Sequence, residues 1–270
     1  MGNTRRNKLI IVKLGGSVVT FKDSPVPKAR ISAINRLSKE IFGVYKQGFK
    51  IILVHGAGSF GHPLAKKYNL TQGLKDETSC IGFTETALAM LQLNQIIIKS
   101  LQKIGLPAVS LPPHTFITQT NNRLDNFDTS IINNFVKKGF VPVLYGDPVI
   151  DKKIGCSILS GDVIIPYLAK KLKAEKIIFL TDVDGIFTDD PRKNPQAKLL
   201  KRIGNKNLQK VLAFLKSSGR DDVTGEMNGK ILSLMNAGLR CPATVTNGLK
   251  PNNLIAAVLG KQVGTKLNLN

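Results

Sequence analysis

Short apolar runs rich in Ile and Val recur along the chain, and each is followed by a turn that contains Gly or Asp. Runs in which nearly every position is apolar are typical of strands that are buried on both faces of a sheet. The pattern therefore predicts a sheet that is covered by helices on both sides. The predicted strands are Leu9–Leu14 and residues 50–54, 140–144 and 176–180.

Apolar residues at helical spacing separate these runs. Residues 111–126, rich in Pro, Thr and Asn, are expected to form a loop or an excursion from the main fold. The alternation of strands and helices favours an α/β fold, a three-layer α/β/α sandwich with a mainly parallel central sheet. No linker is visible, so residues 9–270 are expected to form a single domain that follows a basic tail of residues 1–8. The predicted helices cover residues 28–47, 79–104, 130–138, 161–172, 207–217 and 229–237.

The chain is strongly basic, with 39 Lys and Arg residues against 18 Asp and Glu residues and a formal net charge of +21. Such an excess attracts anions, among them nucleotides, phosphorylated metabolites and nucleic acid. Aromatic residues make up only 6% of the chain and Trp is absent, so no platform for stacking nucleic-acid bases is visible. Nucleic acid is therefore not an expected partner despite the charge.

Three widely separated cysteines form no CxxC motif, which predicts neither a disulfide framework nor a zinc site. The apolar run behind the basic start is too short for a signal peptide, and no apolar stretch approaches the length of a membrane span. We expect a cytoplasmic protein without a membrane partner.

Two glycine-rich turns follow the first two predicted strands. Lys13-Leu14-Gly15-Gly16-Ser17 closes the first, and the segment from His55 to Pro63, with three glycines and two histidines, follows the second. Glycines let backbone N–H groups approach phosphate oxygens closely, and a following helix adds its positive end. Neither turn fits a standard nucleotide signature. The second turn contains GxGxxG at Gly56, Gly58 and Gly61, but in a dinucleotide-binding fold this motif follows the first strand, and a Walker loop is absent.

Two further clusters follow later in the chain. Thr181-Asp182-Val183-Asp184-Gly185 ends the fourth predicted strand, and residues 221–230 place Lys230 near the start of a predicted helix. We identify no metal-binding set among these residues. Lysines, glycine turns and the absence of a Ser-His-Asp set suit phosphoryl transfer, in which catalysis is mainly positioning and charge neutralisation.

These motifs together resemble the amino-acid-kinase superfamily. The resemblance rests on Lys13 to Ser17, on the second glycine loop, on Thr181 to Arg192 and on the Thr-Gly-x-Met-x-x-Lys pattern that ends at Lys230, and it spans residues 13–247. Within the superfamily, Gly56-Ala57-Gly58-Ser59-Phe60-Gly61-His62-Pro63 is similar to the isopentenyl phosphate kinase family. The chain departs from that family at Glu226, where a Gly is usual.

The resemblance implies the following roles. Lys13, Lys22, His62 and Lys230 would be catalytic, with Lys22 neutralising charge on the transferred group and His62 donating to the acceptor phosphate. Phe83 and Met90 would line a pocket for an apolar tail. ATP would be bound by Lys13, Leu14, Gly15, Gly16, Ser17, Gly58, Asp182, Asp184, Gly185, Gly225 and Lys230. The acceptor would be bound by Gly56, Ala57, Gly58, His62 and Gly161.

By the same resemblance, the expected reaction converts isopentenyl phosphate and ATP into isopentenyl diphosphate and ADP, in an alternative mevalonate route to isoprenoids that is common in archaea. Mg²⁺ is expected to arrive with the nucleotide, and a homodimer is implied. The alternatives are another kinase of the same fold, acting on uridylate, an acyl carboxylate or a phosphonate, and a regulator that binds nucleotide or nucleic acid.

Overall fold

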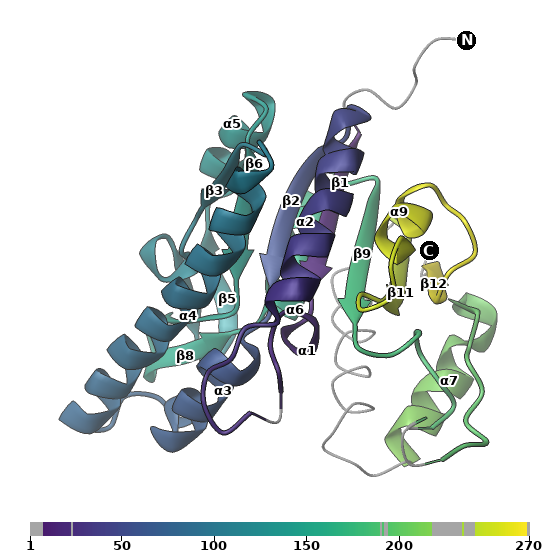
Figure 1. The fold of residues 1–270 in the computed structure, drawn as a ribbon. Helices are drawn as coiled ribbons and strands as arrows, with labels where there is room; N and C mark the ends of the chain where they lie inside the picture. The colour runs from purple at the N-terminus through teal and green to yellow at the C-terminus, as the bar shows by residue number, and fades with distance from the viewer. Residues whose placement is uncertain are drawn as a thin grey trace.

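Eight strands form the central sheet of the structure, a computed structural model that describes residues 8–22, 24–189, 191, 194–217, 234 and 241–268 (Figure 1). Their order in the sheet is β10-β12-β11-β9-β1-β2-β6-β3. The strands are β1 (Leu9–Leu14), β2 (Lys50–His55), β3 (Ala108–Ser110), β6 (Val141–Tyr145), β9 (Lys176–Thr181), β10 (Arg202–Gly204), β11 (Ala243–Asn247) and β12 (Thr265–Asn268).

The sheet is mainly parallel, as the apolar runs predict. β1 pairs in parallel with β2 on one side and with β9 on the other, and the parallel pattern continues to β6, β3 and β11. Only the pairing of β11 with β12 is antiparallel within this sheet of the described chain. All four predicted strands are confirmed, three of them with ends that differ by one residue.

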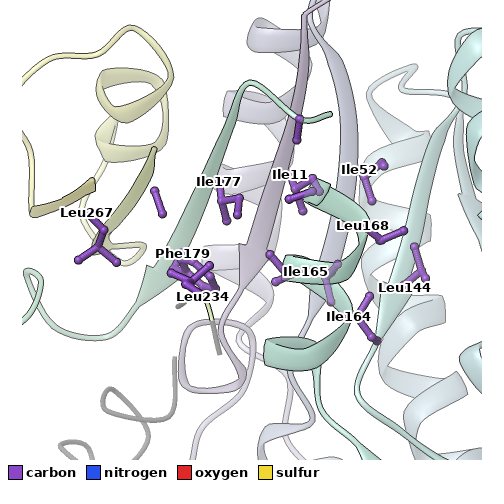
Figure 2. Close-up of a cluster of buried hydrophobic side chains, with 14 of the residues drawn as sticks. Ile11, Ile52, Leu144, Ile164, Ile165, Leu168, Ile177, Phe179, Leu234 and Leu267 are labelled. Atoms are coloured by element: carbon purple, nitrogen blue, oxygen red, sulfur yellow. The ribbon is translucent and has the colours of Figure 1, made fainter. Parts of the chain in front are cut away.

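Helices cover both faces of the sheet, so the predicted three-layer sandwich is confirmed. Neighbouring residues on one strand belong to opposite cores. Ile11 lies in the core to which α5, α6 and α7 contribute, whereas Ile10 lies in the core to which α1, α2, α4 and α9 contribute. Figure 2 shows Ile11, Ile52 and Ile177 of three strands meeting Ile165 and Leu168 of α6. The helices are α1 (Gly16–Val19), α2 (Ile31–Lys46), α3 (Gly58–Lys67), α4 (Glu77–Lys103), α5 (Ser130–Lys137), α6 (Gly161–Lys171), α7 (Asn205–Ser217) and α9 (Asn253–Val258).

Five of the six predicted helices are confirmed, and the sixth, at 229–237, lies outside the described residues apart from Leu234. α3 was not expected, because its segment contains Gly58, Gly61 and Pro63, which all disfavour helix. It packs against α4, and this tertiary contact outweighs the weak local preference.

A second, four-stranded sheet has the order β5-β4-β7-β8. Of the two alternatives for 111–126, the loop was therefore wrong, since the segment leaves the central sheet and forms strands of the second one. Threonine, glutamine and asparagine hide the strand pattern there, because one face of the hairpin is exposed and its buried apolar residues are few, chiefly Ile117 and Phe127. The strands are β4 (Ile117–Thr120), β5 (Arg123–Phe127), β7 (Asp147–Asp151) and β8 (Gly155–Leu159).

Asp151 ties together the two hairpin turns of this second sheet. Its carboxylate accepts backbone hydrogen bonds from Asn121 (2.9 Å), Asn122 (2.8 Å), Lys153 (3.0 Å) and Ile154 (3.2 Å). Burial raises the pKa of the carboxyl group, but the four N–H donors together lower the pKa by more than burial raises it. The net result is a pKa of about 2. The ionised form thus stabilises the folded sheet.

We expect Asp151→Ala to lower the free energy of unfolding at pH 7 by about 3 kcal/mol, because four N–H donors lose their acceptor. Since the folded pKa is below the ordinary 3.8, the wild-type contribution is present above about pH 4 and is lost as the pH falls towards 2. Urea unfolding of wild type and variant at pH 7 and pH 3 measures both effects. Asp125→Ala is the control. It removes the surface pair with Lys152 and an exposed 3.4 Å hydrogen bond from the Thr118 hydroxyl, and it should cost less than about 1 kcal/mol.

α4 is the one helix of the described residues that is long and apolar enough to cross a membrane, judged by length and composition only. The sequence did not lead us to expect such a stretch, because single polar residues interrupt it. One face of the helix, including Met90, Leu93 and Ile97, is buried in the core against α2 and β3. A core helix passes the same test, so this feature is weak evidence for a membrane span.

Candidate active site

The carboxyl ends of four parallel strands bring the predicted site residues to one edge of the central sheet. Leu14 at the end of β1 pairs with His55 of β2 and with Leu180 of β9, and His55 pairs in turn with Tyr145 of β6. The turns that follow these strands therefore lie side by side. Ligands of open parallel sheets bind at this edge.

The two glycine turns pack directly against each other. A Cβ atom on Gly16 would lie 2.6 Å from the backbone nitrogen of Gly58, and one on Gly56 would lie 2.6 Å from the nitrogen of Gly16. Gly58 also has a φ of +50°, a backbone conformation that residues with a Cβ atom rarely adopt. Glycine is thus required here because two backbones touch, in addition to any need for close approach to phosphate.

Thr20 locks this contact between the turns. Its hydroxyl donates to the carbonyl of Gly16 at 2.8 Å and accepts from the backbone N–H of Ser59 at 3.1 Å. No described residue accepts a hydrogen bond from the backbone N–H groups of Ala57 and Gly58. The start of α3 thus presents donors and the positive end of a helix to the cavity described next.

Two carboxylates hold polar side chains of the first turn. The Nζ atom of Lys13, a residue that is only 7% exposed, lies 2.8 Å from a carboxylate oxygen of Asp162 at the start of α6. Ser17 donates to Asp182 at 3.0 Å. Lys13 is nearly buried, and Asp162 lies in the first turn of its helix. The ion pair therefore holds the ammonium group of Lys13 in one position.

A cavity of about 220 Å³ opens above these turns. Its wall joins elements that are distant in sequence. The predicted residues on the wall are Lys13, Gly15, Gly16, Ser17, Lys22, Gly56, Ala57, Gly58, His62, Met90, Gly161 and Asp182. The wall also includes Gly61, Ala65, Thr86, Gly146, Asp147, Pro148, Ile158, Leu159, Ser160, Asp162, Thr181 and Val183.

Four predicted residues do not line the described cavity. Leu14 is buried in the core, and Gly185, with a φ of +153°, forms a turn against Thr265. Asp184 instead accepts from Lys250 at 2.7 Å and from Asn247, and these hydrogen bonds lower its pKa. Phe83 is half-buried one turn before Thr86 on α4, so the wall ends short of it.

Three residues of interest in the sequence lie outside the described residues. These are Gly225, Glu226 and Lys230. Their expected roles at the nucleotide phosphates remain predictions.

The structure adds a buried acid that sequence reasoning missed. Asp147, only 1% exposed, is on the cavity wall, and its carboxylate lies 2.7 Å from Nδ1 of His114. That hydrogen bond raises the pKa of His114, while burial raises the pKa of Asp147. The available signal was the Tyr145-Gly146-Asp147 sequence after a predicted strand, which resembles the ends of the other site strands.

Within the described chain, no group of three or more His, Cys, Asp or Glu side chains could hold a metal ion by itself. Asp162 and Asp182 are the carboxylates next to the glycine turns, and they already engage Lys13 and Ser17. A divalent ion would therefore need oxygen ligands from a bound phosphate as well, as Mg²⁺ commonly has.

Comparison with known proteins places this geometry in context. The profile of the amino acid kinase family matches residues 8–247. The isopentenyl phosphate kinase of Methanocaldococcus jannaschii is 41% identical over 270 residues, which cover 97% of this chain and 99% of that protein.

Solved structures agree with the sequence comparison. One set of crystal structures of isopentenyl phosphate kinase aligns with a TM-score of 0.81 at 34% identity, covering 96% of this chain and all of the other. A structure described as an isopentenyl phosphate kinase substrate complex aligns with a TM-score of 0.79 at 29% identity, covering 97% and 100% of the two chains.

Proposed function

Because this chain belongs to the amino acid kinase family, we propose that it transfers a phosphoryl group from ATP to isopentenyl phosphate. The products are isopentenyl diphosphate and ADP. Relatives that match nearly the whole chain bear the name of this activity. We favour turnover over a regulator that only binds nucleotide or nucleic acid, because lysines occupy the expected phosphate positions on the cavity wall, at Lys13 and Lys22.

One observation carries the proposal: a single cavity combines cationic and backbone donors with an apolar wall. Lys13 and the glycine turns lie on it at the ends of β1 and β2, with Lys22 after α1 and His62 on α3. The apolar part of the wall comes from α3, α4 and the second sheet, through Ala65, Met90, Pro148 and Ile158. Such a cavity suits an acceptor that has a phosphate at one end and a hydrocarbon chain at the other.

The reaction needs charge neutralisation more than a base. A phosphate monoester has a second pKa of about 6 and is mostly a dianion at pH 7, so its oxygen is already a nucleophile. That oxygen attacks the γ-phosphorus of ATP, and the bond to the oxygen that stays on ADP breaks. Lys13, Lys22 and the N–H groups of Ala57 and Gly58 would offset the repulsion between the two anions.

We assign acceptor recognition to His62, Gly56, Ala57, Gly58 and Gly161. His62 would donate a hydrogen bond to the acceptor phosphate. A carboxylate acceptor would fit this donor less well than a phosphate does.

We assign the nucleotide phosphates to the first glycine turn, with Asp182 beside it. The nucleotide site is also expected to include Asp184, Gly185, Gly225 and Lys230. The last two lie outside the described residues. When bound with the nucleotide, Mg²⁺ would supply charge neutralisation of its phosphate oxygens.

The apolar tail would lie against Met90, with Phe83 further along the same face of α4. Thr86 lies between them at helical spacing. Because Phe83 is not on the described wall, Met90 is the stronger candidate.

We also propose a homodimer in the cytoplasm. α4 exposes three large apolar residues on one stripe, Ile81, Leu88 and Leu91, of which Leu88 is 56% exposed. A second copy could cover this stripe. Sedimentation equilibrium tests the proposal, and a monomer at micromolar concentration would contradict it.

The function is tested by measuring ADP release from ATP with isopentenyl phosphate, uridylate and acetylglutamate as acceptors, with and without Mg²⁺. We expect turnover with isopentenyl phosphate and Mg²⁺ only. Preferred turnover of uridylate or acetylglutamate would assign the chain to another branch of the family.

His62→Ala should lower kcat/KM for isopentenyl phosphate by about 100-fold, because a hydrogen bond to a charged group contributes about 1.5–3 kcal/mol. The dissociation constant of ATP should change by less than about twofold. Steady-state kinetics and calorimetry measure the two effects. His62→Gln keeps an N–H donor and should recover part of the activity. If His62→Ala turned over isopentenyl phosphate as well as the wild type does, His62 would not be an acceptor-binding residue.

A further inference from the structure

His55 is a fully buried histidine directly behind the second glycine turn. It is the last residue of β2, it is 0% exposed, and its ring stacks on Tyr145 with the ring centroids 4.9 Å apart. Nδ1 lies 3.0 Å from the carbonyl oxygen of Gly56, and Nε2 lies 3.2 Å from Nδ2 of Asn94 on α4. Both ring nitrogens thus have partners, although the ring does not line the cavity.

These partners fix one tautomer. A carbonyl oxygen only accepts, so Nδ1 must carry the proton and donate to Gly56. Nε2 then has a lone pair, and the Asn94 amide donates to it. Burial lowers the pKa of His55 to about 4, against the smaller upward effect of the hydrogen bond to Gly56. The ring is therefore neutral near pH 7, with a defined donor on one side.

The hydrogen bond from His55 sets the direction of the next peptide. In a planar trans peptide the C=O of one residue and the N–H of the next point in opposite directions. The carbonyl of Gly56 faces the buried ring, so the N–H of Ala57, a residue on the cavity wall, points away from that ring. The N–H of Gly56 is itself held by the carbonyl of Leu14 at 2.9 Å.

We propose that His55 is a positioning residue, which holds the Gly56–Ala57 peptide so that the Ala57 N–H is aimed at the acceptor phosphate. Asn94 acts through His55 by keeping the proton on Nδ1. This inference rests on the proposed function and deepens it, since it explains what keeps a backbone donor in place in a glycine turn that has no rigidity of its own.

The test compares two variants of similar size. The Nδ2 atom of an Asn side chain can occupy the position of the His Nδ1, so His55→Asn keeps the donor to Gly56, whereas His55→Leu removes it. We expect His55→Leu to raise the KM for isopentenyl phosphate about tenfold, with the KM for ATP changed by less than twofold. His55→Asn should stay within about threefold of wild type. Equal KM increases for both substrates, or equal behaviour of the two variants, would leave His55 a packing residue and overturn the proposal.

A second measurement does not depend on the variants or on turnover. The chain has only three histidines, so ¹⁵N spectra of the imidazoles in the wild-type protein are simple to assign. We expect a proton on Nδ1 of His55 that does not titrate between pH 5 and pH 8. Inorganic phosphate or isopentenyl phosphate should shift the Ala57 amide proton downfield. A proton on Nε2, or an Ala57 amide that responds to neither anion, would refute the positioning role.

The two measurements separate the inference from the function it rests on. If the wild-type protein phosphorylates none of the acceptors tested, the proposed function fails. The imidazole tautomer and the response of the Ala57 amide to inorganic phosphate would still decide whether His55 aims that amide.

Discussion

Lys13→Met should lower kcat by about 1000-fold, the largest effect we expect from any described residue. Lys13 is nearly buried on the cavity wall, and its ammonium group is held by Asp162. A fixed cation in a site shielded from water stabilises developing negative charge far more than one in solvent, and removing a single such group commonly costs about 100- to 1000-fold. Single-turnover measurements with saturating ATP and isopentenyl phosphate would report the chemical step.

Lys8→Met is the matched control, since Lys8 precedes the same strand but is exposed in a pair with Glu175. It should keep wild-type activity. Because Lys13→Met leaves Asp162 without its cation, thermal unfolding must show that the variant is folded at the assay temperature. A folded Lys13→Met variant with kcat within threefold of wild type would show that Lys13 has a structural role only.

Gly16→Ala should lower kcat/KM by about 100-fold while the protein stays folded. The added methyl group would lie 2.6 Å from the nitrogen and 2.9 Å from the Cα of Gly58, and both atoms belong to the backbone. The two turns must then move apart, which shifts the N–H donors of both. A displacement of about 1 Å in a phosphoryl-transfer site is enough for a 100-fold loss.

Gly43→Ala separates this contact from the general effect of losing a glycine. Gly43 lies in α2, and a Cβ atom there would meet nothing within 4 Å. We expect full activity and a gain in stability of about 0.5–1 kcal/mol, since Ala favours helix over Gly. If Gly16→Ala were as active as Gly43→Ala, the close packing of the two turns would have no part in catalysis.

Much of the site was accessible from the sequence because its residues follow strands that are easy to recognise. The strands at β1, β2 and β9 are continuous apolar runs, and the chemistry follows each of them directly, at Gly15, Gly56 and Asp182. Parallel strands bring such turns to one edge without further information. The resemblance to a kinase family then gave the residues their roles.

Other features were not predictable because their cause is contact between distant segments. α3 contains Pro63 and two glycines and is helical where it packs on α4. The hairpin of β4 and β5 consists mostly of polar residues and forms one half of a sheet with β7 and β8. Asp147 became a site residue only when β6 was placed beside β2.

By itself, the sequence determined the local elements and the chemical groups available. The spacing of apolar residues predicted the sheet and its covering helices, and the lysines, histidines and glycines predicted phosphate chemistry. The tertiary structure decided which of these groups work together. It joined Lys13 to Asp162 across 149 positions, pressed two glycine turns into contact and buried His55 in one tautomer. The reason is physical: periodicity acts through neighbours along the chain, whereas the state of a charge or a proton depends on whatever the fold packs around it.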